Sequence, residues 1–313
     1  MKTGLSKEAG KWLAARFGPD ARFSEPMAAY TALGVGGPAD ALVTVADDKA
    51  LADLLAGCKK RGLPLHFLGG GTNLLVADAG VRGVVARLGQ GFSRLVICKT
   101  PSGTLLSAGA AAPLARAVSR AVARGFSGML FAAGIPGTVG GAVAGNAGTA
   151  EGGVQDALRD FSAVTWDGKR RRLSARRVQW AYRSLCPAPG DPGWAVITRA
   201  RFALSPGDPA ALAKKLDQTL AGRKKVQPAG VRSAGSFFKN PENGRPAGML
   251  IDRAGCKGLC LGGAAVSDVH ANFLVNKGRA TAADFLGLAD MVKEKVFAAF
   301  GIELVPEVRI LGA

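Results

Sequence analysis

The chain has 313 residues, of which 48% are apolar and 20% charged, so it is long enough for a well-buried core and for two or three domains. Its formal net charge of +18 favours anionic partners, either nucleic acid or phosphorylated small molecules. Lysine and arginine are spread along the chain, however, and aromatic residues, which stack on bases, make up only 6%. We therefore expect most of these charges to form a solvated face, and we expect no nucleic-acid partner.

Cysteine content and hydropathy exclude further classes. The five cysteines are scattered, and Cys256 and Cys260 lack a second pair of ligands, so we predict no disulfide framework and no metal site. Reduced thiols and an N-terminus without a signal-peptide core fit a cytoplasmic protein. The uncharged stretch 126–150 is long enough to span a bilayer, but it is mostly glycine and alanine and is broken by Ile-Pro-Gly. We interpret it as loops and expect no membrane insertion.

The first two thirds of the chain alternate between helix and strand signals. Trp12, Leu13 and Phe17 have the spacing of a short amphipathic helix, and Asp47 is placed to cap a helix over 49–61. The other elements expected here are a helix at 113–124 and strands at 40–46, 65–68, 74–76, 83–88, 94–98, 160–166 and 194–204.

The polar, proline-rich segment 205–211 marks a boundary, because Asp208 and Pro209 begin a new helix that runs to about Lys225. Further along, Thr281 and Asp284 have the spacing of a capping box that opens a long helix. The apolar stripe of this helix, expected to pack in the core, consists of Phe285, Leu288, Val292, Val296 and Phe300. The remaining elements are a helix at 246–255 and strands at 270–276 and 302–313.

Three glycine-rich loops, which hold only two charged residues between them (Asp40 and Glu151), precede residue 154. They are "ALGVGGPAD" (32–40), "LGGGTNLLV" (68–76) and "AAGIPGTVGGAVAGNAGTAEGG" (132–153), the last with eight glycines. One glycine triplet alone is as consistent with a tight turn as with a ligand site. Three such loops together favour close approach of backbone amides to a large cofactor, because glycine turns consecutive amides toward one point.

The loop "SAGSFFKNP" (233–241) allows two interpretations. It could be a turn anchored by two phenylalanines, or a site that presents a hydroxyl and a cation to an anionic reactant. The residues of the loop alone leave both open.

The chain resembles the UDP-N-acetylenolpyruvoylglucosamine reductases, flavoenzymes of bacterial cell-wall synthesis. The resemblance covers nearly the whole chain and rests on "GVGGPAD", "LGGGTNLLV", "GIPGTVGGAVAGNAGT", "AYRS", "AGSFFKNP", "GGAAVSDVHANFLVNKG" and "PEVRILG", in the family's order. The glycine loops alone indicate only the wider class of flavin-binding folds similar to vanillyl-alcohol oxidase. "AGSFFKNP" and "PEVR" narrow it to this reductase.

The resemblance implies an α+β fold with a two-part FAD-binding region of the vanillyl-alcohol-oxidase-like type and a separate α/β substrate domain. Residues 1–90 with 302–313 would form the first FAD-binding part, 91–204 the second, and 205–301 the substrate domain. FAD would be bound non-covalently. The cofactor-binding residues that the resemblance implies are Gly69, Gly70, Gly71, Thr72, Asn73, Ile135, Pro136, Gly137, Gly140, Gly141, Asn146, Gly148 and Arg309.

The family reaction reduces UDP-N-acetylglucosamine enolpyruvate to UDP-N-acetylmuramate. NADPH reduces FAD, and the flavin then delivers hydride to the vinyl carbon, which leaves an enolate-like intermediate that must be stabilised and protonated. By resemblance Arg183 is the active-site arginine, Glu307 helps to polarise the carboxylate, and Ser236 donates the proton. The implied substrate-binding residues are Lys239, Asn240 and His270. We expect a monomer.

One motif departs from the family pattern. The family usually shows Tyr-Arg-x-Ser-x-Phe, whereas this chain reads "YRSLCP", with Ser184 one position early and no aromatic residue. That puts the role of Ser184 in doubt but not that of Arg183. The chain also lacks the segment that carries a substrate-clamping tyrosine, as in the shorter form of the family. Two alternatives remain: another flavin oxidase on the same scaffold, and a basic nucleic-acid-binding protein.

Overall fold

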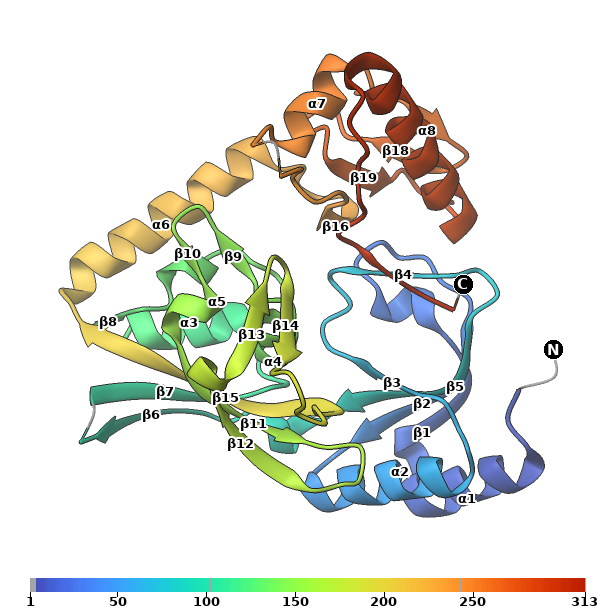
Figure 1. The fold of residues 1–313 in the computed structure, drawn as a ribbon, viewed down its shortest axis with the longest axis vertical. Helices are drawn as coiled ribbons and strands as arrows, with labels where there is room; N and C mark the ends of the chain where they lie inside the picture. Colours follow the sequence, from blue (N-terminus) through green and yellow to red (C-terminus); the bar gives the residue numbers. More distant parts are fainter. Residues whose placement is uncertain (1–3, 102, 243, 313) are drawn as a thin grey trace.

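The computed structural model describes residues 4–101, 103–242 and 244–312. Over these residues the fold is α+β, with larger sheets of four, six and four strands. Figure 1 shows two sheet-containing parts side by side and a third part, containing α7 and α8, above them. The predicted fold class is confirmed.

The first sheet has the strand order β1-β2-β5-β3, with β1 antiparallel to β2 and the other three strands parallel. Helices α1 and α2 bury Leu13, Leu51 and Leu54 against this sheet. Asp47 caps α2 as predicted, because its side chain accepts a hydrogen bond of 2.8 Å from Ala50 N. The bounds are α1 (Lys7–Phe17), β1 (Ala21–Pro26), β2 (Pro38–Val45), α2 (Asp48–Lys60), β3 (Leu65–Leu68) and β5 (Val81–Leu88).

The second sheet is antiparallel, with the order β12-β11-β15-β7-β6 and the short strand β8 beside β15. Helix α3 and the short helices α4 and α5 share its hydrophobic core. The bounds are β6 (Leu95–Thr100), β7 (Gly103–Gly109), α3 (Leu114–Val122), β8 (Phe126–Ser127), α4 (Val139–Ala144), α5 (Val154–Ala157), β11 (Leu158–Val164), β12 (Arg170–Ser174) and β15 (Val196–Pro206). Two small hairpins accompany it: β9 (Gly148–Thr149) with β10 (Gly152–Gly153), and β13 (Val178–Ala181) with β14 (Ser184–Pro187).

The expectation that 126–150 holds only loops is wrong for α4. Thr138 caps this helix by accepting a hydrogen bond of 3.3 Å from Gly141 N. Val139, Ala142 and Val143 are buried on the core side. Their packing outweighs the low helix propensity of the glycines between them.

The third part contains an antiparallel sheet of order β16-β19-β18-β17 with α7 and α8. The long helix α6 joins it to the rest of the chain (Figure 1), and α8 has the predicted capping box of Thr281 and Asp284. The stripe of α8 is buried in the core, with Phe300 only partly so. The bounds are α6 (Pro209–Val226), β16 (Arg232–Ser236), α7 (Ala247–Arg253), β17 (Cys260–Leu261), β18 (Ala264–Val266), β19 (Phe273–Asn276) and α8 (Ala282–Phe300).

The chain ends beside the first part of the molecule. Strand β20 (Arg309–Leu311) pairs in parallel with β4 (Leu74–Val76), as the red segment of Figure 1 shows. The predicted strand over 302–313 is therefore correct only near its end. Residues 302–308 do not form a ladder, since Pro306 has no N–H to extend one.

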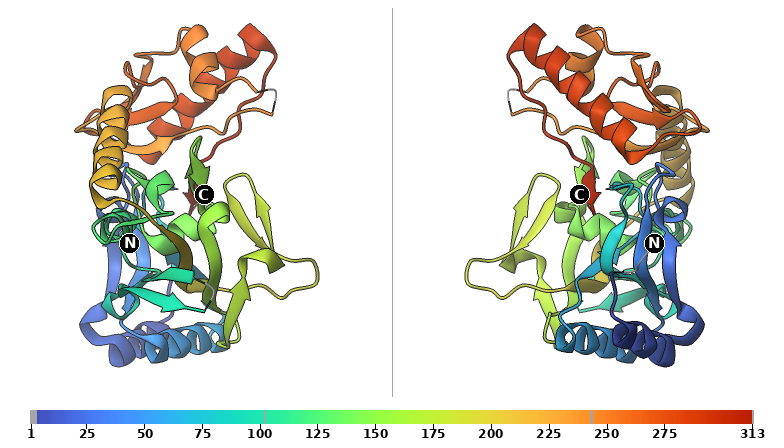
Figure 2. Two further views of the ribbon diagram at one scale, coloured as in Figure 1. Left: turned by 90° about the vertical axis from the view of Figure 1, so that its left-hand side faces the viewer. Right: turned by 90° about the vertical axis from the view of Figure 1, so that its right-hand side faces the viewer.

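Figure 2 shows that the third part lies to one end of the molecule and that β12 to β14 project from its side. All five cysteines are free. Within the described residues, no helix has the length and hydropathy needed to cross a membrane.

Candidate active site

Arg183 lies at the tip of the β13–β14 hairpin, where its backbone has a φ of 57°. This left-handed conformation is uncommon for a residue other than glycine. Arg183 Nη1 donates a hydrogen bond of 3.0 Å to Gly148 O, and the guanidinium also faces the ring of Tyr182. The hairpin therefore presents Arg183 in a strained but well-anchored conformation, of the kind that clusters at functional sites.

Arg183 forms an ion pair with Glu307, from the other end of the chain. Arg183 Nε and Glu307 Oε1 are 2.9 Å apart, but the Nε–H is not aligned as a hydrogen bond, and the nitrogen is buried. Burial raises the pKa of the Glu307 carboxyl, although Arg183 and Lys239 both act to lower it. The pair thus combines a fixed cation with a carboxyl group that favours its protonated form more than an exposed glutamate does.

Ser236 ends strand β16, directly after Gly235, which has a φ of 80°. The register between β16 and β19 is irregular from Ser233 to Ser236. Such an irregularity redirects a side chain, and only glycine adopts this backbone conformation without strain. The positive φ explains why a glycine precedes the serine.

The two phenylalanines after Ser236 are each 1% exposed. Buried Asn272 binds both sides of Phe238: Phe238 N donates to Asn272 Oδ1 at 2.9 Å, and Asn272 Nδ2 donates to Phe238 O at 2.8 Å. Phe237 N also donates to Asn272 O at 2.7 Å. The loop is therefore fixed from below by packing and by three hydrogen bonds to one residue.

The segment that carries Glu307 runs along the same loop. Glu307 N donates to Phe237 O at 2.8 Å, and Lys239 N donates to Val305 O at 2.9 Å. Asn73, predicted to bind the cofactor, donates from Nδ2 to Glu307 O at 3.2 Å. The structure thereby brings Arg183, Ser236 and Glu307 to one place and attaches a glycine-rich loop to it.

The glycine-rich loops 68–76 and 132–153 pack against each other. A Cβ atom on Gly70 would lie 2.8 Å from Gly137 Cα, and one on Gly137 would lie 2.8 Å from Thr72 Oγ1. Thr72 Oγ1 also donates to Pro136 O, at 3.4 Å. Side chains at these glycines would force the loops apart, so the sequence keeps both backbones close together and accessible.

Asn146 connects the glycine-rich loop 132–153 to the β13–β14 hairpin that carries Arg183. Its Nδ2 donates to Ala181 O at 3.1 Å and to Gln155 Oε1 at 3.2 Å. Its Oδ1 is buried and accepts no hydrogen bond from the described residues. A buried acceptor without a donor is costly, and a bound group with an N–H would satisfy it. The loops and this acceptor fit a flavin, whose ring system carries such a donor.

The other predicted contacts are positioned less decisively. Asn240 Oδ1 accepts from Ala247 N at 3.0 Å at the start of α7. His270 Nδ1 accepts from Asn272 N at 3.2 Å, and burial lowers the pKa of His270. These bonds support the local fold, and in His270 they leave Nε2 as the protonated nitrogen of the neutral ring. Arg309 is exposed on β20.

Sequence reasoning missed Arg223, near the end of α6. A Cβ atom on Gly134 would lie 2.7 Å from Arg223 Cδ. Burial lowers the pKa of Arg223, Glu151 raises it, and the charge of Arg183 lowers it further. Arg223 therefore lies over the glycine-rich loop 132–153 and within electrostatic range of Arg183. In the sequence it belongs to the run "RKK" on an expected helix, and no signal separated it from its solvated neighbours.

Comparisons with known proteins identify the family of the chain. A model of the UDP-N-acetylenolpyruvoylglucosamine reductase C-terminal domain matches residues 227–311, and a model of an FAD binding domain matches 39–174. UDP-N-acetylenolpyruvoylglucosamine reductase from Desulfosudis oleivorans is 45% identical over 306 residues, which are 96% of this chain and 98% of that protein. The corresponding enzyme from an Anaeromyxobacter species is 47% identical over 92% of this chain and 87% of its own length. The chain belongs to the UDP-N-acetylenolpyruvoylglucosamine reductase family.

A crystal structure of UDP-N-acetylenolpyruvylglucosamine reductase from Thermus caldophilus also superposes on the chain. The TM-score is 0.77 at 35% identity, over 93% of this chain and 98% of that one. These matches confirm three predictions: the family, FAD as the cofactor, and the function of an oxidoreductase in peptidoglycan synthesis. The glycine-rich loops 68–76 and 132–153 lie in the segment matched by the FAD model, Ser236 and Glu307 lie in the C-terminal match, and Arg183 lies between the two matches. The roles of the individual residues stay predictions.

Proposed function

We propose that this reductase converts UDP-N-acetylglucosamine enolpyruvate to UDP-N-acetylmuramate with NADPH as the electron donor. The observation that carries the proposal is the 2.9 Å ion pair of Arg183 and Glu307 beside the loop of Ser236. These side chains come from a hairpin, a strand end and the C-terminal segment. No single local structure requires them to meet, so a shared reaction is the simplest reason that they do.

Arg183 and Glu307 bind the substrate's carboxylate and stabilise the charge that develops on it. The planar guanidinium of Arg183 is held by Gly148 O, so it needs no reorganisation when that charge appears. The raised pKa of Glu307 increases the protonated fraction of its carboxyl, and the protonated form donates a hydrogen bond to an oxygen that gains negative charge. Lys239 adds a second cation close enough to affect Glu307.

Ser236 donates the proton that completes the reduction. Its backbone is fixed by Gly235, by the buried phenylalanines and by Asn272, so the position of its Cβ is set before substrate arrives. When bound, FAD supplies the two-electron chemistry that links NADPH to the vinyl group. The residues that would hold FAD are in the glycine-rich loops 68–76 and 132–153, the second of which includes Asn146.

The test is to time the two half-reactions of Ser236→Ala separately by anaerobic stopped flow. We expect the variant to stay yellow and to be bleached by NADPH at a near-normal rate, because that step needs no acid at the substrate carbon. Reoxidation by the enolpyruvyl substrate should fall by about a hundredfold or more, the low end for a lost proton donor.

Ser236→Cys is the matched control, since a thiol keeps a donor at nearly the same position. It should recover part of the reoxidation rate that alanine loses. If alanine slows both half-reactions equally, or neither, Ser236 is not the proton donor. If wild-type reduced enzyme is not reoxidised by the enolpyruvyl substrate without oxygen, the proposed substrate is wrong.

A further inference from the structure

A second group of arginines lies away from the candidate active site, along the edge strand β12. The sequence "RRRLSARR" (170–177) covers β12 and the 3-10 turn η5 (Ala175–Arg177), and five of its eight residues are arginine. In Figure 2 this strand belongs to the part that projects from the side of the molecule. Neither the flavin nor the enolpyruvyl reaction requires this group.

Two open cavities follow the two sides of β12, and we call them together the arginine groove. One, of about 480 Å³, is lined by Leu158, Arg159, Asp160, Arg172, Ser174, Ala175 and Arg176. The other, of about 700 Å³, is lined by Arg171, Arg172, Leu173, Ser174, Arg177, Ala188, Pro189, Gly190 and Asp191. Arg172 and Ser174 line both, so the two cavities adjoin at β12. Each volume lies in the range of small-molecule sites, roughly 300–1,000 Å³.

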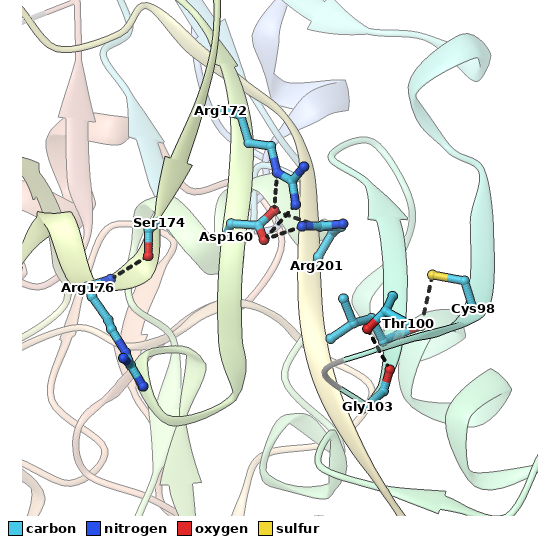
Figure 3. A network of polar contacts seen from close by, with 9 residues as sticks. Cys98, Thr100, Gly103, Asp160, Arg172, Ser174, Arg176 and Arg201 are labelled. Atoms are coloured by element: carbon cyan, nitrogen blue, oxygen red, sulfur yellow. Dashed lines mark hydrogen bonds and ion pairs between the residues drawn. The ribbon is translucent and has the colours of Figure 1, made fainter.

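Carboxylates orient part of the groove without neutralising it. Asp160 accepts hydrogen bonds from Arg172 at 3.1 and 3.2 Å and from Arg201 at 2.7 and 2.5 Å, as Figure 3 shows. Asp191 binds Arg171 through two bonds of 2.6 Å. These bidentate contacts fix planar guanidinium groups in place. The lining contains five arginines and only two carboxylates, so its net charge is positive.

Within the described part of the chain, the other three lining arginines are left without a carboxylate partner. Among the residues that the structure describes, the guanidinium groups of Arg159, Arg176 and Arg177 form no ion pair or hydrogen bond. Charged side chains can keep an edge strand from pairing with another chain. That role needs charges on β12 itself, whereas all three of these arginines lie outside it. A structural role therefore leaves their concentration around one groove unexplained.

We propose that the arginine groove binds a ligand with several consecutive phosphates, recognised by its charge. Arginine forks match phosphate oxygens geometrically, and the Ser174 hydroxyl at the centre supplies a further donor. No aromatic side chain lines either cavity, so the groove has no stacking platform for a base. The shared chemistry is the phosphate chain, which a free polyphosphate and the tail of a nucleoside triphosphate both provide.

The test uses the FAD-loaded protein and sodium tripolyphosphate in isothermal titration calorimetry at low salt. Arg176→Ser with Arg177→Ser removes two guanidinium groups that support no other described residue. Arg116→Ser with Arg120→Ser on α3 is the matched control, since both are exposed arginines outside the groove. We expect the groove variant to weaken binding by about tenfold or more, as for lost charge-assisted contacts, and the control to change it little. Unchanged flavin absorption verifies folding.

Adenosine triphosphate and an oligothymidylate test whether the groove recognises the phosphate chain alone or a nucleotide. If adenosine triphosphate binds about as tightly as tripolyphosphate, the phosphate chain alone is recognised, as proposed. Much tighter binding of the nucleotide would overturn recognition by charge alone. Tighter binding of an oligothymidylate, lost in the groove variant, would assign the groove to single-stranded nucleic acid. Equal weakening in the groove and control variants would mean that tripolyphosphate responds only to net charge, and the proposal would fail.

Discussion

The loop of Ser236 and the hairpin of Arg183 supply two predicted catalytic residues by opposite means. The serine loop is anchored in the core, with Phe237 and Phe238 buried and Asn272 bound to both. The arginine is half-exposed on a two-residue turn with a left-handed backbone, anchored by one carbonyl and one carboxylate. Ser236 is therefore positioned by the packing of the core, whereas Arg183 is positioned by local polar and charged contacts and has a strained backbone. Damage to the first should affect stability and activity together, and damage to the second should separate them.

The largest expected effect is on the serine loop. Asn272→Ala leaves the buried N–H and C=O of Phe238 without their partners, which should lower the free energy of unfolding by about 3 kcal/mol. We also expect slower reoxidation by substrate, because Ser236 loses its support. Urea unfolding followed by circular dichroism and stopped-flow reoxidation measure the two effects.

Asn276 provides the control for Asn272. It is also a buried asparagine in this part of the chain, and its side chain binds Leu33 O, Gly278 N and Ala280 N. Asn276→Ala should destabilise the protein by a similar amount without slowing reoxidation of the folded enzyme. If both variants slow reoxidation equally, the clamp on Ser236 has no special role.

The sequence predicted the serine loop more completely than the arginine hairpin, and the reason is physical. Two adjacent phenylalanines after a glycine and a serine indicate a buried anchor, and the capping residues Asp47, Asp208 and Thr281 are local signals that the structure confirms. The ion pair between Arg183 and Glu307 joins residues 124 positions apart, and no local pattern encodes their meeting. The family resemblance implies only that both residues act in the active site.

Other features had no usable signal at all. Arg223 is distinguished from its neighbours only by the rotation of α6 over Gly134. Helix α4 forms through packing that its glycine-rich sequence does not suggest. The arginine groove was counted within a solvated face, because only the folded hairpin brings Arg159 to Arg176 and Arg177.

A smaller effect should come from the titration of Glu307, which lies between the two regions. Burial raises its folded-state pKa above the ordinary value of 4.5, against the opposing effects of Arg183 and Lys239. At a pH between the ordinary and the raised pKa, the Glu307 carboxyl is ionised in the unfolded chain and protonated in the folded protein. Its contribution to stability is therefore complete below the ordinary pKa and is lost as the pH rises through the raised one.

Glu307→Gln removes this titration and keeps a side chain of similar shape. We expect the stability of the wild type relative to the variant to fall as the pH rises above 4.5, the ordinary pKa of the carboxyl, while the contributions of other groups cancel in the difference. Urea unfolding of both proteins across this range measures it. A relative stability that rises with pH would mean that the ion pair with Arg183 outweighs burial.

The smallest expected effect separates strain from function at Arg183. Arg183→Ala and Arg183→Gly both remove the guanidinium, so both should slow reoxidation by substrate to a similar extent. They differ in the backbone, because a φ of 57° costs an alanine about 1 kcal/mol that a glycine does not lose. The strain therefore favours the glycine variant by about 1 kcal/mol. The extra conformational entropy that glycine loses on folding offsets part of this difference, and the glycine variant should remain the more stable of the two. Unfolding midpoints at one pH, with equal flavin content, make the comparison. Equal stabilities would show that the hairpin relaxes once the arginine is gone, and that the contacts to Gly148 and Glu307 impose the left-handed turn. A more stable glycine variant with equally low activity would show that the turn itself is strained and is retained because it presents Arg183 to the substrate.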